Sequence, residues 1–298
     1  MKLIVGNNIE INQDLAITIG KFDGLHKGHM ALITKLKEVA AEQGLATAVL
    51  SFSPHPAVVL GGKSISLILS PYEKSHILGQ LGLDYYIEYP FTHHFAQISP
   101  EIFIKNIIFQ QLCSKALIVG ENFRFGMDGR GDVVLAQRLG ADLGLRVHTM
   151  PLVADGAAQI SSANVRRLVA AKDFRAVTQT CGRNFTLMGP VVHGKKNGRK
   201  MGFPTANIVP HKDKLLPPRG VYATTAYVEN ISYDSITNVG TDLVETHLLD
   251  FSGDLYGRIL RVDFLQWMRD MQSFESFEML AKQLAIDAKN RNTICIDI

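Results

Sequence analysis

The sequence predicts an α/β protein in two parts, a parallel β-sheet covered by helices and then a small antiparallel β-barrel. Over about the first 180 residues, apolar runs typical of buried strands alternate with runs that have the 3.6-residue spacing of helices. After Cys181-Gly182 the pattern changes to short strand-like runs separated by glycine and proline. We place the boundary at Gly182, which gives predicted domains 1–182 and 183–298.

In the first domain, strands and helices are expected to alternate along the chain. Ser99-Pro100-Glu101 has the capping residue, the proline and the acid of a helix start, and Gly144 should end another helix. Such alternation predicts ligands at the carboxyl ends of the strands. The expected strands are 15–19, 47–52, 85–89, 116–120 and 145–150, and the expected helices are 30–43, 71–81 and 132–143.

In the second domain, the expected barrel strands are short and are followed by one helix. Phe277, Leu280 and Leu284 fall along one face of that C-terminal helix. The expected strands are 185–192, 221–228, 235–239, 246–251 and 258–265, and the helix is 274–289.

The composition predicts a globular cytoplasmic protein. Hydrophobic residues make up 46% of the chain, and no apolar run approaches the roughly twenty residues that a membrane span needs. Three scattered cysteines favour a reducing compartment over a disulfide framework or a zinc site. A formal net charge of +3, without a basic stripe interleaved with aromatics, does not indicate a nucleic-acid partner. A homo-oligomer is compatible with the sequence, but nothing in it indicates one.

The run from Gly20 to His29 places two histidines three residues apart where an apolar strand turns into a helix. Residues at i and i+3 share one helix face, so His26 and His29 can reach the same phosphate. The helix N-terminus favours anions, and the glycines permit a tight backbone path. The alternative is a pair of surface or core histidines. We expect a nucleotide site whose binding residues are Gly20, Phe22, Asp23, Gly24 and Gly28, although Asp23 is equally suited to capping the turn.

Three further polar segments follow predicted strands of this sheet. They are Ser53-Pro54-His55-Pro56, Gly120 to Gly126 with its Asn-Phe-Arg-Phe-Gly end, and Ile160 to Arg166. Ser161 and Ser162 can cap a helix, but with Arg166 one turn later they also suit a phosphate clamp. We therefore assign Ser161, Ser162 and Arg166 to nucleotide binding.

In the second domain, a basic glycine-rich loop runs from Gly194 into a turn with the sequence Gly-Phe-Pro-Thr-Ala-Asn. A charge run is usually a solvated face, but glycines let backbone N–H groups approach a phosphate. Thr205 and Asn207 offer neutral oxygens suited to Mg²⁺ on that phosphate. We expect nucleotide binding at Gly194, Gly198 and Gly202 and metal binding at Thr205 and Asn207.

Taken together, the segments of the first domain resemble the adenylyltransferase part of the prokaryotic bifunctional riboflavin kinase and FAD synthetase family. The resemblance covers residues 14–180 and includes Arg130-Gly131-Asp132, with Ala163 where the family usually has threonine. It implies a Rossmann-like nucleotidyltransferase domain in which a phosphate oxygen of FMN attacks the α-phosphorus of ATP, giving FAD and pyrophosphate. His26 and His29 would be catalytic by charge stabilisation, since a phosphate nucleophile needs no general base. Flavin binding is assigned to Pro54, His55, Pro56, Asn122 and Arg124.

The second domain resembles the riboflavin kinase domain of the same family over about residues 183–290. The motifs are Val192-His193-Gly194, the 202–207 turn, Gly220 to Ala223, Asn238 to Gly240, Glu245 to Phe251, and Leu255-Tyr256-Gly257. The resemblance implies that Glu245 is the general base for the ribityl 5′-hydroxyl as it attacks the γ-phosphate of ATP. Arg269 is assigned to flavin binding. Two departures are a short loop before Glu245, over residues 241–244, and Met271 in place of an acid.

The resemblance implies one enzyme that phosphorylates riboflavin to FMN and adenylylates FMN to FAD, with riboflavin, FMN, FAD and ATP as partners and Mg²⁺ as cofactor. Two alternatives stay open. One is an FAD synthetase whose kinase domain is impaired by the short loop. The other is a flavin-binding or RNA-binding regulator that kept the fold without turnover.

Overall fold

The computed structural model describes residues 1–62, 64–155, 158–194, 203–229, 231–241 and 243–294. The chain packs as two compact units. The first unit comprises Met1–Ser66 and Lys74–Ser161, and the second comprises Leu67–Glu73 and Ser162–Ile298. The division falls inside one helix, between Glu73 and Lys74.

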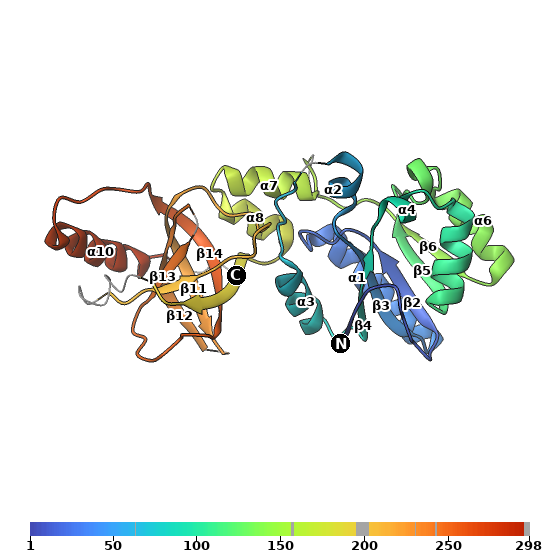
Figure 1. Ribbon diagram of the computed structural model, residues 1–298, viewed down its shortest axis with the longest axis horizontal. Helices are drawn as coiled ribbons and strands as arrows, with labels where there is room; N and C mark the ends of the chain where they lie inside the picture. The colour runs from blue at the N-terminus through green and yellow to red at the C-terminus, as the bar shows by residue number, and fades with distance from the viewer. Residues whose placement is uncertain (63, 156–157, 195–202, 230, 242, 295–298) are drawn as a thin grey trace. The chain divides into compact units, whose positions relative to one another are not determined.

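The first unit is a six-stranded parallel sheet with strand order β1-β4-β3-β2-β5-β6, as the alternating pattern predicts. Figure 1 shows this sheet with α1 and α6 beside it; α1 packs against β2, β3 and β5, and α6 packs against β6. Buried apolar residues such as Leu15, Ile17, Leu50 and Leu117 form its core. Its strands are β1 (Lys2–Val5), β2 (Leu15–Ile19), β3 (Ala46–Ser53), β4 (Tyr85–Pro90), β5 (Ser114–Gly120) and β6 (Arg146–Met150).

Between these strands lie helices and short turns of helix. The helical elements are α1 (Lys27–Gln43), α2 (Pro56–Gly61), α3 (Pro71–Gln80), α4 (His93–Ala96), α5 (Pro100–Ile102), η1 (Phe103–Gln111), η2 (Met127–Gly129) and α6 (Val133–Leu143). A two-stranded hairpin, β7 (Ala154–Asp155) with β8 (Ala158–Gln159), follows β6.

The predicted helix ends are confirmed at several positions. The hydroxyl of Ser99 accepts from the N–H of Ile102, and the carboxylate of Asp132 accepts from the N–H of Leu135. Gly144 ends α6 in the left-handed conformation. The predicted start of the first helix at residue 30 is wrong, because α1 begins at Lys27 and takes His29 into its first turn.

The second unit is a closed antiparallel barrel with strand order β10-β13-β12-β11-β14-β9. Its aromatic core includes Phe174, Phe185, Tyr222 and Phe264. The elements are α7 (Ser162–Ala170), α8 (Phe174–Cys181), β9 (Phe185–Val192), β10 (Ala206–Ile208), β11 (Gly220–Val228), β12 (Ile231–Val239), β13 (Val244–Leu248), β14 (Ile259–Arg269) and α10 (Phe277–Arg291).

Several expected boundaries in this unit are shifted. The strand expected over 235–239 begins at Ile231, and the strand expected over 258–265 ends at Arg269. The strand expected over 246–251 begins at Val244 and ends at Leu248, and the helix expected over 274–289 runs from Phe277 to Arg291 because Ser276 caps it. Ion pairs hold α10 to the barrel, between Arg269 and Asp287 and between Arg291 and Asp234, both at 2.7 Å. Within the described residues, no helix is both long and apolar enough to cross a membrane.

Candidate active sites

The strand order of the first unit predicts where a ligand binds. The chain leaves β2 toward β3 on one side, whereas β5 pairs with β2 on the other side. In open parallel sheets, ligands bind at the carboxyl ends of the two strands where the order reverses. The turn that begins at Gly20 follows β2, and the segment that begins at Gly120 follows β5. Two of the segments that the sequence singled out therefore flank this point.

The turn after β2 presents the two histidines at the start of α1. His26 is the N-cap residue and His29 lies in the first turn, with their rings stacked at a centroid distance of 3.8 Å. A side chain at Gly28 would meet Nδ1 of His26 at 3.2 Å, so glycine there leaves room for the ring. Both imidazoles therefore lie at the end of a helix whose first N–H groups attract anions.

The backbone of this turn is strained. Phe22 and Leu25 have positive φ angles of 46° and 41° and are almost fully buried. Such conformations are unfavourable for residues with a Cβ and persist where packing enforces them. The ring of Phe22 contacts that of His29 at 5.0 Å between centroids. The turn is thus fixed by packing on one side and carries the histidines on the other.

Burial and positive neighbours keep His29 neutral. Its pKa lies well below the usual value for histidine, chiefly because the ring is desolvated, and further because His26 and Lys74 are close. Its Nδ1 is enclosed and has no hydrogen-bond partner among the described residues. A phosphate arriving here would favour the protonated ring, because an anion raises the pKa of a neighbouring histidine.

The other predicted residues of the first sheet stand at strand ends. His55 caps α2, because its Nδ1 accepts from the N–H of Ala57 at 3.2 Å, and Pro54 and Pro56 flank it. Asn122 and Arg124 are exposed, and Arg124 lies 3.6 Å from Asp132. A side chain at Gly120 would meet the amide oxygen of Asn122 at 3.1 Å. Flavin binding by these residues stays a prediction.

The residues predicted to clamp a phosphate are divided between the two compact units along the chain. Ser161 is the last residue of the first unit, and Ser162 begins α7 in the second, with Arg166 one turn later. All three are partly buried. Their assignment to nucleotide binding stays a prediction.

In the barrel, the predicted metal residues line a cavity of about 610 Å³. Thr205 and Asn207 contribute to its wall together with Gly194 and the segment 251–256. A Cβ at Gly194 would lie 2.4 Å from Nδ2 of Asn207, so the amide occupies the space that glycine leaves. Neutral oxygens beside a cavity of this size fit Mg²⁺, which usually takes few protein ligands and completes its shell with phosphate and water. Among the described residues, no group of three or more His, Cys, Asp and Glu could hold a metal by itself.

Glu245 stands beside these residues in the barrel. In the antiparallel register Glu245 is directly opposite Asn207 on β10 and opposite Asn238 on β12. Directly opposed residues point to the same face of a sheet, so the carboxylate and the two amides share one face. The amide of Asn238 lies 3.5 Å from the Glu245 carboxylate, and both border a second cavity of about 250 Å³.

Three other residues of the second domain were predicted to bind flavin or nucleotide. Arg269 is held by Asp287, and flavin binding by it stays a prediction. Gly198 and Gly202, which were predicted to bind nucleotide, lie outside the described residues.

Sequence reasoning missed the polar residues that surround the histidine turn. Lys74 is buried in α3, and its ammonium donates to the carbonyl of Lys21, at 3.2 Å, and to the hydroxyl of Ser51, at 3.4 Å. Lys21, Ser51 and Lys74 are too far apart in sequence for spacing to reveal them. The only available signal was a charged pair, Glu73-Lys74, in the first turns of an amphipathic helix.

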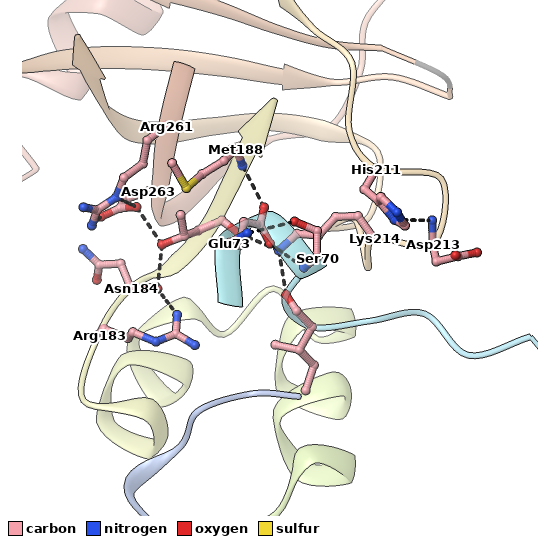
Figure 2. A network of polar contacts seen from close by, with 12 residues as sticks. Ser70, Glu73, Arg183, Asn184, Met188, His211, Asp213, Lys214, Arg261 and Asp263 are labelled. Carbon is pink, nitrogen blue, oxygen red and sulfur yellow. Dashed lines mark hydrogen bonds and ion pairs between the residues drawn. The ribbon is translucent and has the colours of Figure 1, made fainter. Parts of the chain in front are cut away.

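A second buried network, which spacing also could not reveal, lies within the second unit (Figure 2). The Glu73 carboxylate accepts from the N–H of Ser70, at 2.8 Å, and of Met188, at 2.7 Å, and pairs with Lys214 at 2.7 Å. Lys214 also donates to the carbonyls of Ile68 and Thr186. Segment 67–73 is thereby fastened to the barrel.

Comparison with protein-family models gives two matches. The model for FAD synthetase matches residues 8–164, and the model for riboflavin kinase matches residues 181–295.

Curated relatives and one solved structure match this chain over nearly its whole length. The chain is 34% identical to a bifunctional riboflavin kinase/FMN adenylyltransferase of Escherichia coli, over 96% of each chain, and 32% identical to one of Listeria monocytogenes, over 94% of this chain and 92% of that protein. A crystal structure titled as a macrolide-efflux protein from Streptococcus pneumoniae has a TM-score of 0.87 at 26% identity and covers 98% of this chain and 99% of its own.

Proposed function

The chain belongs to the bifunctional riboflavin kinase/FMN adenylyltransferase family, and we propose how its residues divide the two reactions. Residues 1–182 would transfer an adenylyl group from ATP to FMN, and residues 183–298 would phosphorylate riboflavin. A cytoplasmic location is part of the proposal, because both reactions consume ATP.

The stacked histidine pair at the switch point of the sheet is the observation that carries the proposal for adenylyl transfer. The nucleophile is a phosphate oxygen of FMN, which is already an anion, so no base is required. His26 and His29 would donate hydrogen bonds to the α-phosphate and to the leaving pyrophosphate as negative charge shifts between them. Ser161, Ser162 and Arg166 would hold the triphosphate.

In the kinase half, the nucleophile is a hydroxyl and needs a base. Glu245 would take the proton from the ribityl 5′-hydroxyl as its oxygen attacks the γ-phosphorus of ATP and ADP leaves. The proposal is supported by the shared face of Glu245 and Asn207. Thr205 and Asn207 would hold Mg²⁺, which neutralises phosphate charge when bound.

A second candidate function, an FAD synthetase with an impaired kinase, is favoured by one observation. β12 ends at Val239 and β13 begins at Val244, and the N–H of Gly240 donates to the carbonyl of Leu243 at 3.1 Å. Few residues therefore precede Glu245 after β12, whereas the resemblance implies a longer loop there.

The test is incubation of the full chain with riboflavin, ATP and Mg²⁺, with flavins resolved by chromatography over time. We expect FMN and then FAD. His29→Ala should stop at FMN, with adenylyl transfer reduced by about a hundredfold. Glu245→Ala should fail to make FMN yet still convert supplied FMN to FAD. His94→Ala and Glu229→Ala, at exposed positions, are the matched controls.

The outcomes separate the candidates. Conversion of supplied FMN without phosphorylation of riboflavin would replace the bifunctional assignment with the impaired kinase. If Glu245→Ala phosphorylates riboflavin at the unaltered rate, Glu245 is not the base.

A further inference from the structure

A buried lysine lies beside the histidine turn without a role in the reaction as assigned above. Lys74 is 8% exposed, and both acceptors of its ammonium, the carbonyl of Lys21 and the hydroxyl of Ser51, are neutral. Burying an ammonium is unfavourable unless strong partners replace water. Two neutral acceptors at 3.2 and 3.4 Å are weak compensation.

Lys214 is a buried lysine of the same chain whose ammonium has close, strong hydrogen-bond partners. It is 6% exposed, and its Nζ lies 2.7 Å from the Glu73 carboxylate and 2.6 Å from each of two carbonyl oxygens. Lys74, at similar burial, has a pKa below the usual lysine value because desolvation outweighs the attraction of Asp23 and Glu88. Burial thus disfavours the charged form of Lys74, and a neutral donor could satisfy the same acceptors.

The contacts of Lys74 place it at the base of the histidine turn. Ser51 is in β3, and its hydroxyl also donates to the carbonyl of Lys21 at 3.0 Å. Lys74 and Ser51 therefore converge on one carbonyl, which immediately precedes the strained Phe22. Because Phe22 packs on His29, the orientation of this carbonyl fixes the path of the chain into α1.

The charges around this point come from several elements. His26 and Lys74 are the positive neighbours of His29. Asp23 in the turn and Glu88 on β4 are the negative neighbours of Lys74, and Glu88 is itself bound by the hydroxyl of Tyr86 at 2.8 Å. Lys74 therefore both touches the turn and acts on the charge state of His29.

We propose that Lys74 is a positioning residue for adenylyl transfer, which holds the turn between β2 and α1 so that His26 and His29 face the phosphates. The proposal rests on the adenylyl-transfer function assigned to this half. Lys74 acts through the turn and does not touch the reacting atoms.

The test compares Lys74→Met, Lys74→Arg and Ser51→Ala in the full chain, with Lys105→Met, at an exposed position in η1, as matched control. Lys74→Met should lower kcat for conversion of FMN to FAD by about a hundredfold, since misplacement by an ångström costs that much. KM for ATP and FMN should change little, and riboflavin phosphorylation should be unaltered. Ser51→Ala should cost about fivefold, as expected for one neutral hydrogen bond.

A second readout separates positioning from structural damage. In NMR titrations of the histidine rings, the pKa of His29 should rise in Lys74→Met, because a positive neighbour is removed, and should stay near its original value in Lys74→Arg and Lys105→Met. If kcat and the His29 titration of Lys74→Met equal those of the unaltered protein, the proposal is wrong. If Lys74→Met does not fold, Ser51→Ala decides: an unaltered kcat overturns the proposal.

The same assay keeps the two hypotheses apart. An unaltered protein that fails to convert FMN contradicts the assigned function. A protein that converts FMN equally well with methionine at position 74 contradicts only the role of Lys74.

Discussion

At the scale of single residues, the charge state of His29 links the site to the pH dependence of stability. The folded protein holds the pKa of His29 below the usual value of 6.5, so the folded state resists protonation that the unfolded chain accepts. The neutral ring therefore contributes stability above pH 6.5, and this contribution is lost as the pH falls below that value.

We expect His29→Gln to weaken this pH dependence. Glutamine does not titrate, so the loss of stability between pH 7.5 and pH 5.5 should be smaller in the variant than in the unaltered protein. Denaturant midpoints at the two pH values measure the difference. Equal losses in the two proteins would show that His29 does not titrate differently on folding.

In the barrel, Gly194 is a residue whose lack of a side chain is itself required. A Cβ there would lie 2.4 Å from Nδ2 of Asn207, and the amide would have to move. Gly194→Ala should therefore lower riboflavin phosphorylation and raise the Mg²⁺ concentration that gives half-maximal rate, while adenylyl transfer is unaffected. Gly61→Ala is a suitable control, because its Cβ would meet no atom within 4 Å. An unchanged Mg²⁺ dependence in Gly194→Ala would argue against Asn207 as a ligand.

At the scale of elements, long periodic segments were predictable and short ones were not. The helix that ends at Leu143 combines apolar periodicity with recognisable caps, and the strand Leu15–Ile19 is an almost continuous apolar run. β10 has only three residues, Ala206–Ile208, and lies between Pro204 and Pro210, so it is too short to show the alternation of a strand. The start of α1 was missed because His26 caps the helix by backbone conformation, without a side-chain hydrogen bond.

The first turn of α3 contributes Glu73, one partner of a buried ion pair in the second unit. Glu73 and Lys214 are almost fully buried, and each has further hydrogen bonds. Removal of one partner leaves the other charge buried without compensation, which costs about 3–5 kcal/mol. Lys214→Met should therefore lower the free energy of unfolding of this unit by about that amount, whereas Glu73→Leu combined with Lys214→Met should cost less than either single change.

The matched control for this pair lies on the surface. Glu229 and Arg258 are 3.2 Å apart and mostly exposed, so Glu229→Gln should change the free energy of unfolding by well under about 1 kcal/mol. Denaturation followed by the single tryptophan, Trp267 in β14, reports on the barrel. Equal effects at the two pairs would mean that the burial of Glu73 and Lys214 does not increase the contribution of this pair to the free energy of unfolding.

At the scale of the whole molecule, the two activities could be predicted from motifs, but the path of the chain through its compact units could not. Each motif lies within a few consecutive residues, whereas the placement of 67–73 in the second unit depends on contacts with residues far along the chain. Leu67 exchanges backbone hydrogen bonds with Asp213 and Leu215, both at 2.7 Å, and Ile68 is 2% exposed in the barrel core. No local pattern marks these residues as part of a second domain.

A fragment that begins at residue 183 should therefore be an incomplete kinase unit. It lacks segment 67–73, so Lys214 loses the carboxylate of Glu73, and the core loses Ile68, Phe174 and Val177. We expect this fragment to unfold at a lower temperature than the barrel of the full chain and to phosphorylate riboflavin more slowly, with Trp267 fluorescence as the measure of unfolding. In the fragment, Lys214→Met should cost little stability. The Glu73 carboxylate, which this substitution would leave without its partner in the full chain, is absent from the fragment. A fragment as stable and active as the full chain would show that the segment is dispensable for the kinase half.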